Sequence, residues 1–385
     1  MTIASDYTEL AASLFCIGFE HDPLLDPNAE AIPDATRELI RLGVSGAILF
    51  KRNIRSPAQL ARLTATLKNT ANRPFLLAVD QEGGRVARLR GAPFTDLPPM
   101  RKIGEENDES LAFRCGQALA ADLRGVGFDV DFAPVLDVDT NPLNPVIADR
   151  SFGSAPERVA RLGIALARGL EEGGVASCAK HFPGHGDTSQ DSHLDLPRLP
   201  HTMARLRSVE LVPFAAYARA GLASMMSAHV VFEAVDPDLP ATFSSKIQTD
   251  LLRGELGFDG LCICDDLEMR AIADRWPIPE AAVHAVRAGI DLLLVCHRPE
   301  AQLACIEALV REGERSSSFR ARLREASHRV RNFAQRWFRP FTADDFEAPE
   351  LFSADPLPEL CDAASMGLDP DPTDFLNPSK HRVDT

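Results

Sequence analysis

The chain has 385 residues, a hydrophobic fraction of 45% and a formal net charge of −15. A chain of this length and composition can bury a full hydrophobic core, which excludes a wholly disordered protein. The acidic balance argues against nucleic acid as the main partner, and no apolar run approaches the roughly 18 residues that cross a bilayer.

The two ends of the chain differ from its middle. Met1 to Leu10 lacks a basic segment followed by an apolar one, so we expect no signal peptide, a cytoplasmic location and reduced, buried cysteines. Residues 341–385 contain eleven acidic residues, two basic residues and six prolines. This composition predicts one folded domain over residues 1–340 and an extended or disordered tail over residues 341–385.

Within the predicted domain, apolar runs of strand length alternate with amphipathic stretches of helix length. The eight predicted strands cover 14–19, 47–50, 75–79, 128–136, 175–179, 224–230, 261–264 and 290–296. The predicted helices cover 34–42, 57–71, 110–124, 156–172, 203–220, 245–256, 278–288, 299–313 and 319–337. Several of these helices end at a glycine, which is a common helix C-terminal signal.

This alternation predicts the α/β class and favours a (β/α)₈ barrel over an open doubly wound sheet. The open sheet normally carries a glycine-rich phosphate turn after its first strand. Here the first strand leads into Glu20-His21-Asp22-Pro23, which is no such turn. Functional residues of a barrel lie where its strands end. Polar groups follow several predicted strands at 80–85, 137–153, 180–181, 229 and 265–266.

The loop after the fifth strand is the densest polar segment, KHFPGHGDTSQDSH, at residues 180–193. Its proline and glycines exclude a regular helix. Asp191 and His193 are two residues apart, so the carboxylate can orient the imidazole and favour its protonated form. A histidine held in this way can give a proton to a leaving oxygen and later accept one from water.

The seventh strand offers a nucleophile. Side chains alternate along a strand, which predicts that Asp265 faces the barrel interior and that Asp266 faces outward as a helix cap or salt-bridge partner. An ionised Asp265 can attack an electrophilic carbon or stabilise a cationic transition state. Asp80, Arg88 and Arg150 suggest a hydroxylated ligand, because carboxylates accept hydroxyl hydrogens and arginine donates in fixed geometry.

Together with DQEGGRVARL, NPVIADRSFG, MSAHVV and CDDLEM, the loop resembles glycoside hydrolase family 3 over about residues 10–335. The resemblance is to its bacterial β-N-acetylglucosaminidase branch of peptidoglycan recycling. It implies a (β/α)₈ barrel and a retaining exo-hydrolase without a metal or organic cofactor. The implied substrate is N-acetylglucosamine β-1,4-linked to 1,6-anhydro-N-acetylmuramic acid, with or without a peptide. The implied roles are Asp265 as nucleophile, His193 as acid/base with Asp191 as its partner, and sugar binding by Asp80, Arg88, Arg150, Lys180 and His181.

Two departures from the family pattern stand out. Cys264 occupies a position where Ser or Thr is common, and an outward orientation would make this change harmless. The segment beyond residue 340 is too short for the second α/β domain of larger members, which gives His193 more weight as the acid/base.

Several other functions remain open at this point. A phosphorylase on the same fold would transfer the sugar to phosphate, and a histidine acid/base leaves room for that anion. A metal-dependent hydrolase would use ligands from the dense loop, namely His181, His185, Asp187, Asp191 and His193. A non-catalytic sugar-binding barrel is a third possibility. A retaining route in which the substrate's acetamido group attacks would leave no adduct on Asp265.

Overall fold

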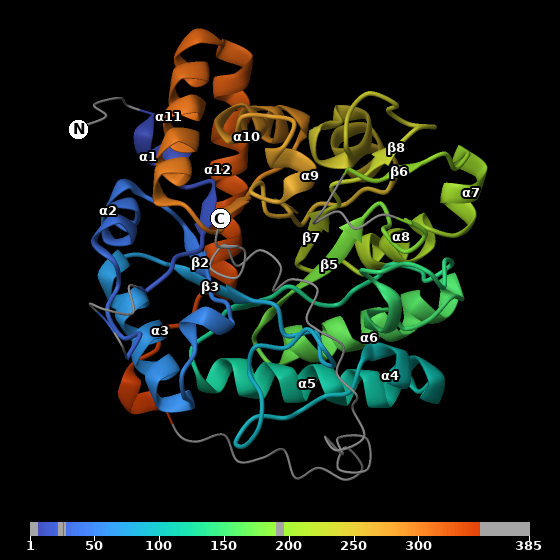
Figure 1. The fold of residues 1–385 in the computed structure, drawn as a ribbon, viewed down its shortest axis with the longest axis horizontal. Coiled ribbons are helices and arrows are strands. Elements are labelled where there is room, and N and C mark those ends of the chain that lie inside the picture. The colour runs from blue at the N-terminus through green and yellow to red at the C-terminus, as the bar shows by residue number, and fades with distance from the viewer. Residues whose placement is uncertain (1–6, 22–25, 27, 190–195, 347–385) are drawn as a thin grey trace, which may run out of the picture.

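The computed structural model describes residues 7–21, 26, 28–189 and 196–346. Eight parallel strands lie at the centre, and helices surround them (Figure 1). The strands are β1 (Phe15–Ile17), β2 (Gly46–Ile48), β3 (Leu76–Val79), β4 (Val130–Asp131), β5 (Ala176–Phe182), β7 (Ser224–Ser227), β9 (Leu261–Cys264) and β10 (Leu293–Val295). Their order in the sheet is β10-β1-β2-β3-β4-β5-β7-β9.

The two edge strands of this order also meet. A parallel bridge joins Ile263 to Leu292, and the Cys264 N–H donates to the Leu292 carbonyl over 3.0 Å. The sheet therefore closes on itself. The predicted (β/α)₈ barrel is confirmed.

The principal helices have the following bounds: α1 (Thr8–Ala12), α2 (Asp34–Leu42), α3 (Pro57–Ala71), α4 (Met100–Glu106), α5 (Glu109–Gly125), α6 (Pro156–Glu172), α7 (Met203–Ser208), α8 (Leu211–Arg219), α9 (Arg270–Ala273), α10 (Ile278–Ala288), α11 (Pro299–Arg315) and α12 (Ser317–Trp337). Local signals set several of these bounds. The Ser56 side chain accepts the Gln59 N–H over 3.2 Å and Pro57 fills the first position of α3. Gly43 ends α2 with a φ of 120°.

The bounds of several predicted elements differ by a few residues from the structure, and three elements differ more. The predicted helix 203–220 is two helices, because Pro213 lacks an N–H and is accepted only in a first turn, so α8 begins at Leu211. The predicted strand 128–136 is shortened to Val130–Asp131, since Pro134 cannot donate to the ladder. The predicted helix 245–256 is π-helical over Lys246–Glu255.

A two-stranded parallel sheet was not predicted. It pairs β6 (Arg198–Leu199) with β8 (Val231–Phe232) and so ties the end of the loop after β5 to the segment after β7. Each strand has two residues, which is too short for a periodic pattern in the sequence.

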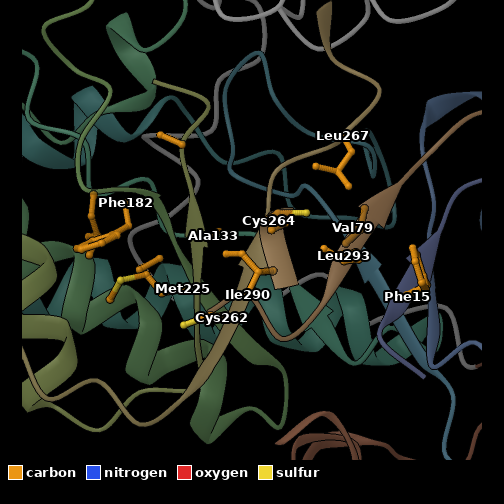
Figure 2. Packing of buried hydrophobic residues seen from close by; sticks show 14 of the residues in the cluster. Phe15, Val79, Ala133, Phe182, Met225, Cys262, Cys264, Leu267, Ile290 and Leu293 are labelled. Carbon is orange, nitrogen blue, oxygen red and sulfur yellow. The ribbon is translucent and has the colours of Figure 1, made fainter. Parts of the chain in front are cut away.

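The core consists of two main apolar layers on opposite faces of the barrel wall. Leu261 and Ile263 of β9 belong to the inner layer, whereas Cys262 and Cys264 belong to the outer layer beneath the helices (Figure 2). The inner layer also contains Phe333 and Trp337 of α12, so this helix packs against the barrel interior. Cys264 thus points away from the interior, as expected.

The described part of the tail is short. Phe341 packs against Ala61 and Ala65 of α3, and residues 347–385 lie outside the described residues, so the domain boundary at 340 stays a prediction. The seven described cysteines are buried and form no disulfide with one another, and Cys361 lies outside the described residues. In the described ranges, every helix is too short or too polar to cross a membrane.

The buried ion pair between Lys68 and Asp129 yields a stability prediction. Lys68 Nζ lies 2.8 Å from Asp129 Oδ1, and both side chains are almost fully buried. Lys68→Ala should lower the free energy of unfolding by about 3 kcal/mol, because it leaves a buried carboxylate with Arg124 as its nearest cation, 3.5 Å away. Urea denaturation measures this change.

The matched control is Arg62→Ala, which removes an exposed pair with Glu30. This variant should lose less than about 1 kcal/mol. Equal losses in the two variants would contradict the importance of burial.

Candidate active site

A pocket opens where the barrel strands end. Its space, including its open mouth, is about 590 Å³. Charged and polar residues of its wall lie after β3 and β4, at the end of β5 and in the loop that follows it, and after β9. Apolar side chains come from β2, β7 and β10 and from the segment after β4. The lining residues are Ile48, Phe50, Asp80, Phe132, Val146, Arg150, Lys180, His181, His185, Met226, Asp265, Asp266, Met269, Leu294 and Cys296.

A network of buried ion pairs forms one side of the pocket. Lys180 Nζ lies 2.8 Å from Asp80 Oδ1 and 2.6 Å from Glu82 Oε1. Arg150 donates to both oxygens of Glu82, each over 2.8 Å. Arg88 Nη2 lies 3.3 Å from Asp80 Oδ2. Four predicted sugar-binding residues thus line the pocket, and the fifth, Arg88, contacts one of them from behind.

Pairing keeps these buried groups charged. Burial alone would raise the pKa of Glu82, but Arg150 and Lys180 outweigh it and hold the pKa of this carboxyl well below its usual range. Burial alone would lower the pKa values of Lys180 and Arg150, but the facing carboxylates raise both. The network therefore presents fixed donors and acceptors to the pocket.

Asp137 holds the start of the loop after β5. Its Oδ2 lies 2.7 Å from His181 Nδ1, and its Oδ1 accepts the backbone N–H groups of His181 (3.2 Å) and His185 (2.7 Å). Burial opposes ionisation of Asp137, but the charge and hydrogen bond of His181 outweigh burial and lower its pKa. Asp137 thereby fixes the ring of His181 at the pocket wall.

His185 is buried beside His181, with ring centroids 5.9 Å apart. Burial, followed by the charge of His181, lowers the pKa of His185 to about 4. His185 is therefore neutral at pH 7, and its Nδ1 lies 2.8 Å from the Thr188 hydroxyl. Within the described ranges, no three His, Cys, Asp or Glu side chains gather in a group suited to a metal ion.

Asp265 and Asp266 follow β9 directly. Asp265 lines the pocket, which agrees with its predicted inward direction. The prediction that Asp266 faces outward is wrong, because it lines the same pocket and is 5% exposed. β9 ends at Cys264, so the alternation of a strand does not extend to Asp266. The Asp266 N–H donates to Asp265 Oδ1 over 2.8 Å.

His229, which follows β7, contacts the backbone of this turn. Its Nε2 lies 3.0 Å from the Asp266 carbonyl, and its Nδ1 lies 2.8 Å from the Thr242 hydroxyl. Burial lowers the pKa of His229, so the ring is neutral. A carbonyl only accepts, so Nε2 carries the hydrogen and Nδ1 accepts from Thr242.

Asp191 and His193, the predicted acid/base pair, lie outside the described residues. The described beginning of their loop is tied to the loop after β4, since the Thr140 hydroxyl donates to Asp187 Oδ1 over 2.6 Å. Its described end is tied down by the β6–β8 pair.

Sequence reasoning assigned no site role to Glu82, Asp137 or His229. Glu82 lies two residues after Asp80, Asp137 follows a predicted strand, and His229 lies near the end of another. The sequence therefore indicated that these residues lie at strand ends, but not which residues they contact. The partners come from different strands, and a single sequence does not show which loops meet.

Comparisons with known proteins place this site among glycosidases. The family model described as "Glycosyl hydrolase family 3 N terminal domain" matches residues 20–333. A "Beta-hexosaminidase" of Alkalilimnicola ehrlichii is 44% identical over 272 residues, which are 69% of this chain and 77% of that protein. One of Chromobacterium violaceum is 41% identical over 313 residues, which are 80% of this chain and 86% of that protein.

Two solved structures are similar over most of the chain. A family 3 β-N-acetylglucosaminidase from Paenibacillus sp. superposes with a TM-score of 0.83 at 40% identity, covering 93% of this chain and 68% of that one. NagZ from Neisseria gonorrhoeae in complex with N-trifluoroacetyl-D-glucosamine superposes with a TM-score of 0.65 at 32% identity. The match covers 82% of this chain and 97% of that one.

Replacing His185 by Gln should reduce the acid sensitivity of the folded protein. An unfolded His takes up a proton near pH 6.5, whereas folded His185 does so near pH 4. Between these values the unfolded state binds more protons, so stability falls as the pH falls. From pH 7 to pH 5, the wild type should lose about 2 kcal/mol more than His185→Gln in urea denaturation.

The control is His328→Gln, an exposed histidine on α12, which should follow the wild-type pH dependence. Parallel stability curves for the wild type and His185→Gln would show that His185 is not buried in its neutral form.

Proposed function

Because this chain belongs to glycosyl hydrolase family 3, we propose that it is a retaining exo-enzyme that releases terminal β-linked N-acetylglucosamine through a covalent intermediate on Asp265. The chain is a glycoside hydrolase of the β-N-acetylhexosaminidase type. One observation supports the proposed covalent mechanism above all. Asp265 lies on the wall of the same pocket as Asp80, Lys180 and Arg150 of the ion-pair network.

The network suits a sugar ring. Asp80 Oδ1 and Oδ2 can each accept a hydroxyl hydrogen, and Lys180 and Arg150 donate. Because these groups are already paired and buried, they lose little freedom when a ring replaces water. We assign sugar binding to Asp80, Arg88, Arg150, Lys180 and His181, with Arg88 acting through its contact with Asp80.

The proposed reaction has two steps. In the first, an Asp265 carboxylate oxygen attacks the anomeric carbon, and His193 protonates the glycosidic oxygen as that bond breaks. In the second, His193 takes a proton from water, which attacks the anomeric carbon and releases Asp265. Asp191 orients the His193 ring and stabilises its protonated form. The outcome is retention of the β configuration.

The proposed substrate is N-acetylglucosamine linked to 1,6-anhydro-N-acetylmuramic acid, with or without a peptide, in cytoplasmic cell-wall recycling. The sequence resemblance supports this choice. So does the similarity to the gonococcal NagZ, whose structure holds an N-acylated glucosamine. Hydrolysis is favoured over transfer to phosphate by the β-hexosaminidase names of the curated relatives.

The role of Asp265 is tested with a 5-fluoro derivative of N-acetylglucosamine that carries a good leaving group. Mass spectrometry of the inactivated wild type should show one added sugar on the peptide that contains Asp265. Asp265→Asn should lose at least about 10³-fold in turnover and take up no label, because an amide is a poor nucleophile.

Asp274→Asn, an exposed carboxylate paired with Arg270, serves as the matched control and should keep wild-type turnover. A label on another residue, or turnover without any covalent adduct, would exclude Asp265 as the nucleophile. The second result would favour attack by the acetamido group.

The role of His193 is tested by leaving-group dependence. His193→Ala should lose about 10²-fold or more with a sugar leaving group, which needs a proton. With an activated aryl leaving group its first step should be nearly unaffected. Azide should then raise turnover and form the β-glycosyl azide, because this anion attacks without a base.

His328→Ala should match the wild type with every substrate, since His328 is exposed on α12. If His193→Ala loses equally with all leaving groups and azide has no effect, the acid/base is another group.

A further inference from the structure

His297 lies behind the pocket wall, directly after β10 and Cys296. Its ring stacks on Phe50, with centroids 6.1 Å apart and planes 26° apart. Its side chain is 8% exposed. The guanidinium of Arg52 lies over Phe50, 4.3 Å from the ring centroid. The ring of His297 is thus held in place by an aromatic side chain that itself lines the pocket.

The residue that His297 faces is Asp266. His297 Nε2 lies 3.3 Å from Asp266 Oδ2, at contact distance but without the geometry of a hydrogen bond, and among the described residues neither atom has a hydrogen-bond partner. The remaining polar groups of Asp266 are occupied. Oδ1 accepts the Glu268 N–H over 3.0 Å, the carbonyl lies 3.0 Å from His229 Nε2, and the N–H donates to Asp265 Oδ1.

From these contacts we propose that His297 is a positioning residue, which holds Asp266 and, through its backbone N–H, sets the carboxylate of Asp265 for attack. The inference rests on the proposed role of Asp265. His297 does not line the pocket and touches no reacting atom. It acts through its contact with Asp266 Oδ2, an oxygen that accepts no hydrogen bond from the described residues.

The backbone at His297 is anchored independently of its ring. The His297 N–H donates to Glu268 Oε2 over 2.6 Å, and Arg298 Nε donates to Glu268 Oε1 over 2.7 Å. A change confined to the ring nitrogens therefore leaves the turn and the Phe50 stack in place. His297→Phe retains an aromatic ring of similar size and removes both nitrogens.

The predicted effect lies in the chemical step. Sugar binding depends on the network around Asp80 and Lys180, which His297 does not contact. A misdirected Asp265 weakens an interaction that forms in the transition state, so kcat should fall while KM changes little. The rate of covalent labelling by the 5-fluoro sugar should fall by the same factor.

The experiment compares His297→Phe, His297→Gln and the wild type as full-length enzymes. His297→Phe should lose about tenfold in kcat and in labelling rate, with KM and the thermal unfolding midpoint close to wild type. His297→Gln should recover most of this loss, because its amide N–H can reach the Asp266 carboxylate.

The matched control is His284→Phe. His284 lies on α10 with its ring 5.8 Å from that of Phe243, away from the pocket, so the same exchange should leave kcat unchanged. Wild-type kcat in His297→Phe overturns the inference. A loss that appears in KM, or that Gln does not recover, also overturns it and assigns His297 to binding or to structure. The experiment also distinguishes failure of this inference from failure of the proposed function. If the proposed function is wrong, the wild-type enzyme will carry no label on Asp265.

Discussion

Charges can be buried at the mouth of a barrel only when each has a partner, and this constraint organises the whole site. Glu82 lies between Arg150 and Lys180, and Asp80 lies between Lys180 and Arg88. Each carboxylate therefore contacts two cations, and removing Glu82 would leave the buried Arg150 without its carboxylate partner. Because these side chains come from the segments after β3 and β4 and from the end of β5, the pairing also fixes the relative positions of these three parts of the chain.

The apolar interior beneath the network strengthens it. Phe132, Leu294 and Ile48 line the pocket and also belong to the inner layer of the core, which continues down to Phe333 and Trp337 of α12. Water and salt screen ion pairs only weakly when they lie next to such an apolar layer. Their attraction is therefore stronger, and their geometry more rigid, than at the protein surface. The packing of a distant helix thus contributes to the rigidity of groups that would meet a substrate.

The fold class was predictable because eight apolar runs of strand length alternate with amphipathic stretches, and local signals mark helix ends, such as Ser56 and Pro57 at the start of α3 and Gly43 at the end of α2. It could not show the short β6–β8 pair, nor the break before Pro213. For the site, period-two alternation placed Asp265 correctly but failed for Asp266, because the strand had already ended. The side-chain partners of Glu82 and Asp137 lie 44 or more residues away in the chain, beyond the reach of local patterns.

The end of β9 at Cys264 has a chemical consequence. If the strand continued, Asp265 and Asp266 would point to opposite faces, and only one would meet the pocket. Because the chain turns, the two adjacent carboxylates share one wall of the pocket. Asp266 Oδ1 accepts the Glu268 N–H and its Oδ2 lies 3.3 Å from the His297 ring, whereas its own N–H donates to Asp265. In the proposed mechanism one carboxylate reacts because its neighbour is anchored. The distinction between them arises from their partners in the segments after β7 and β10, because the two residues are of the same type.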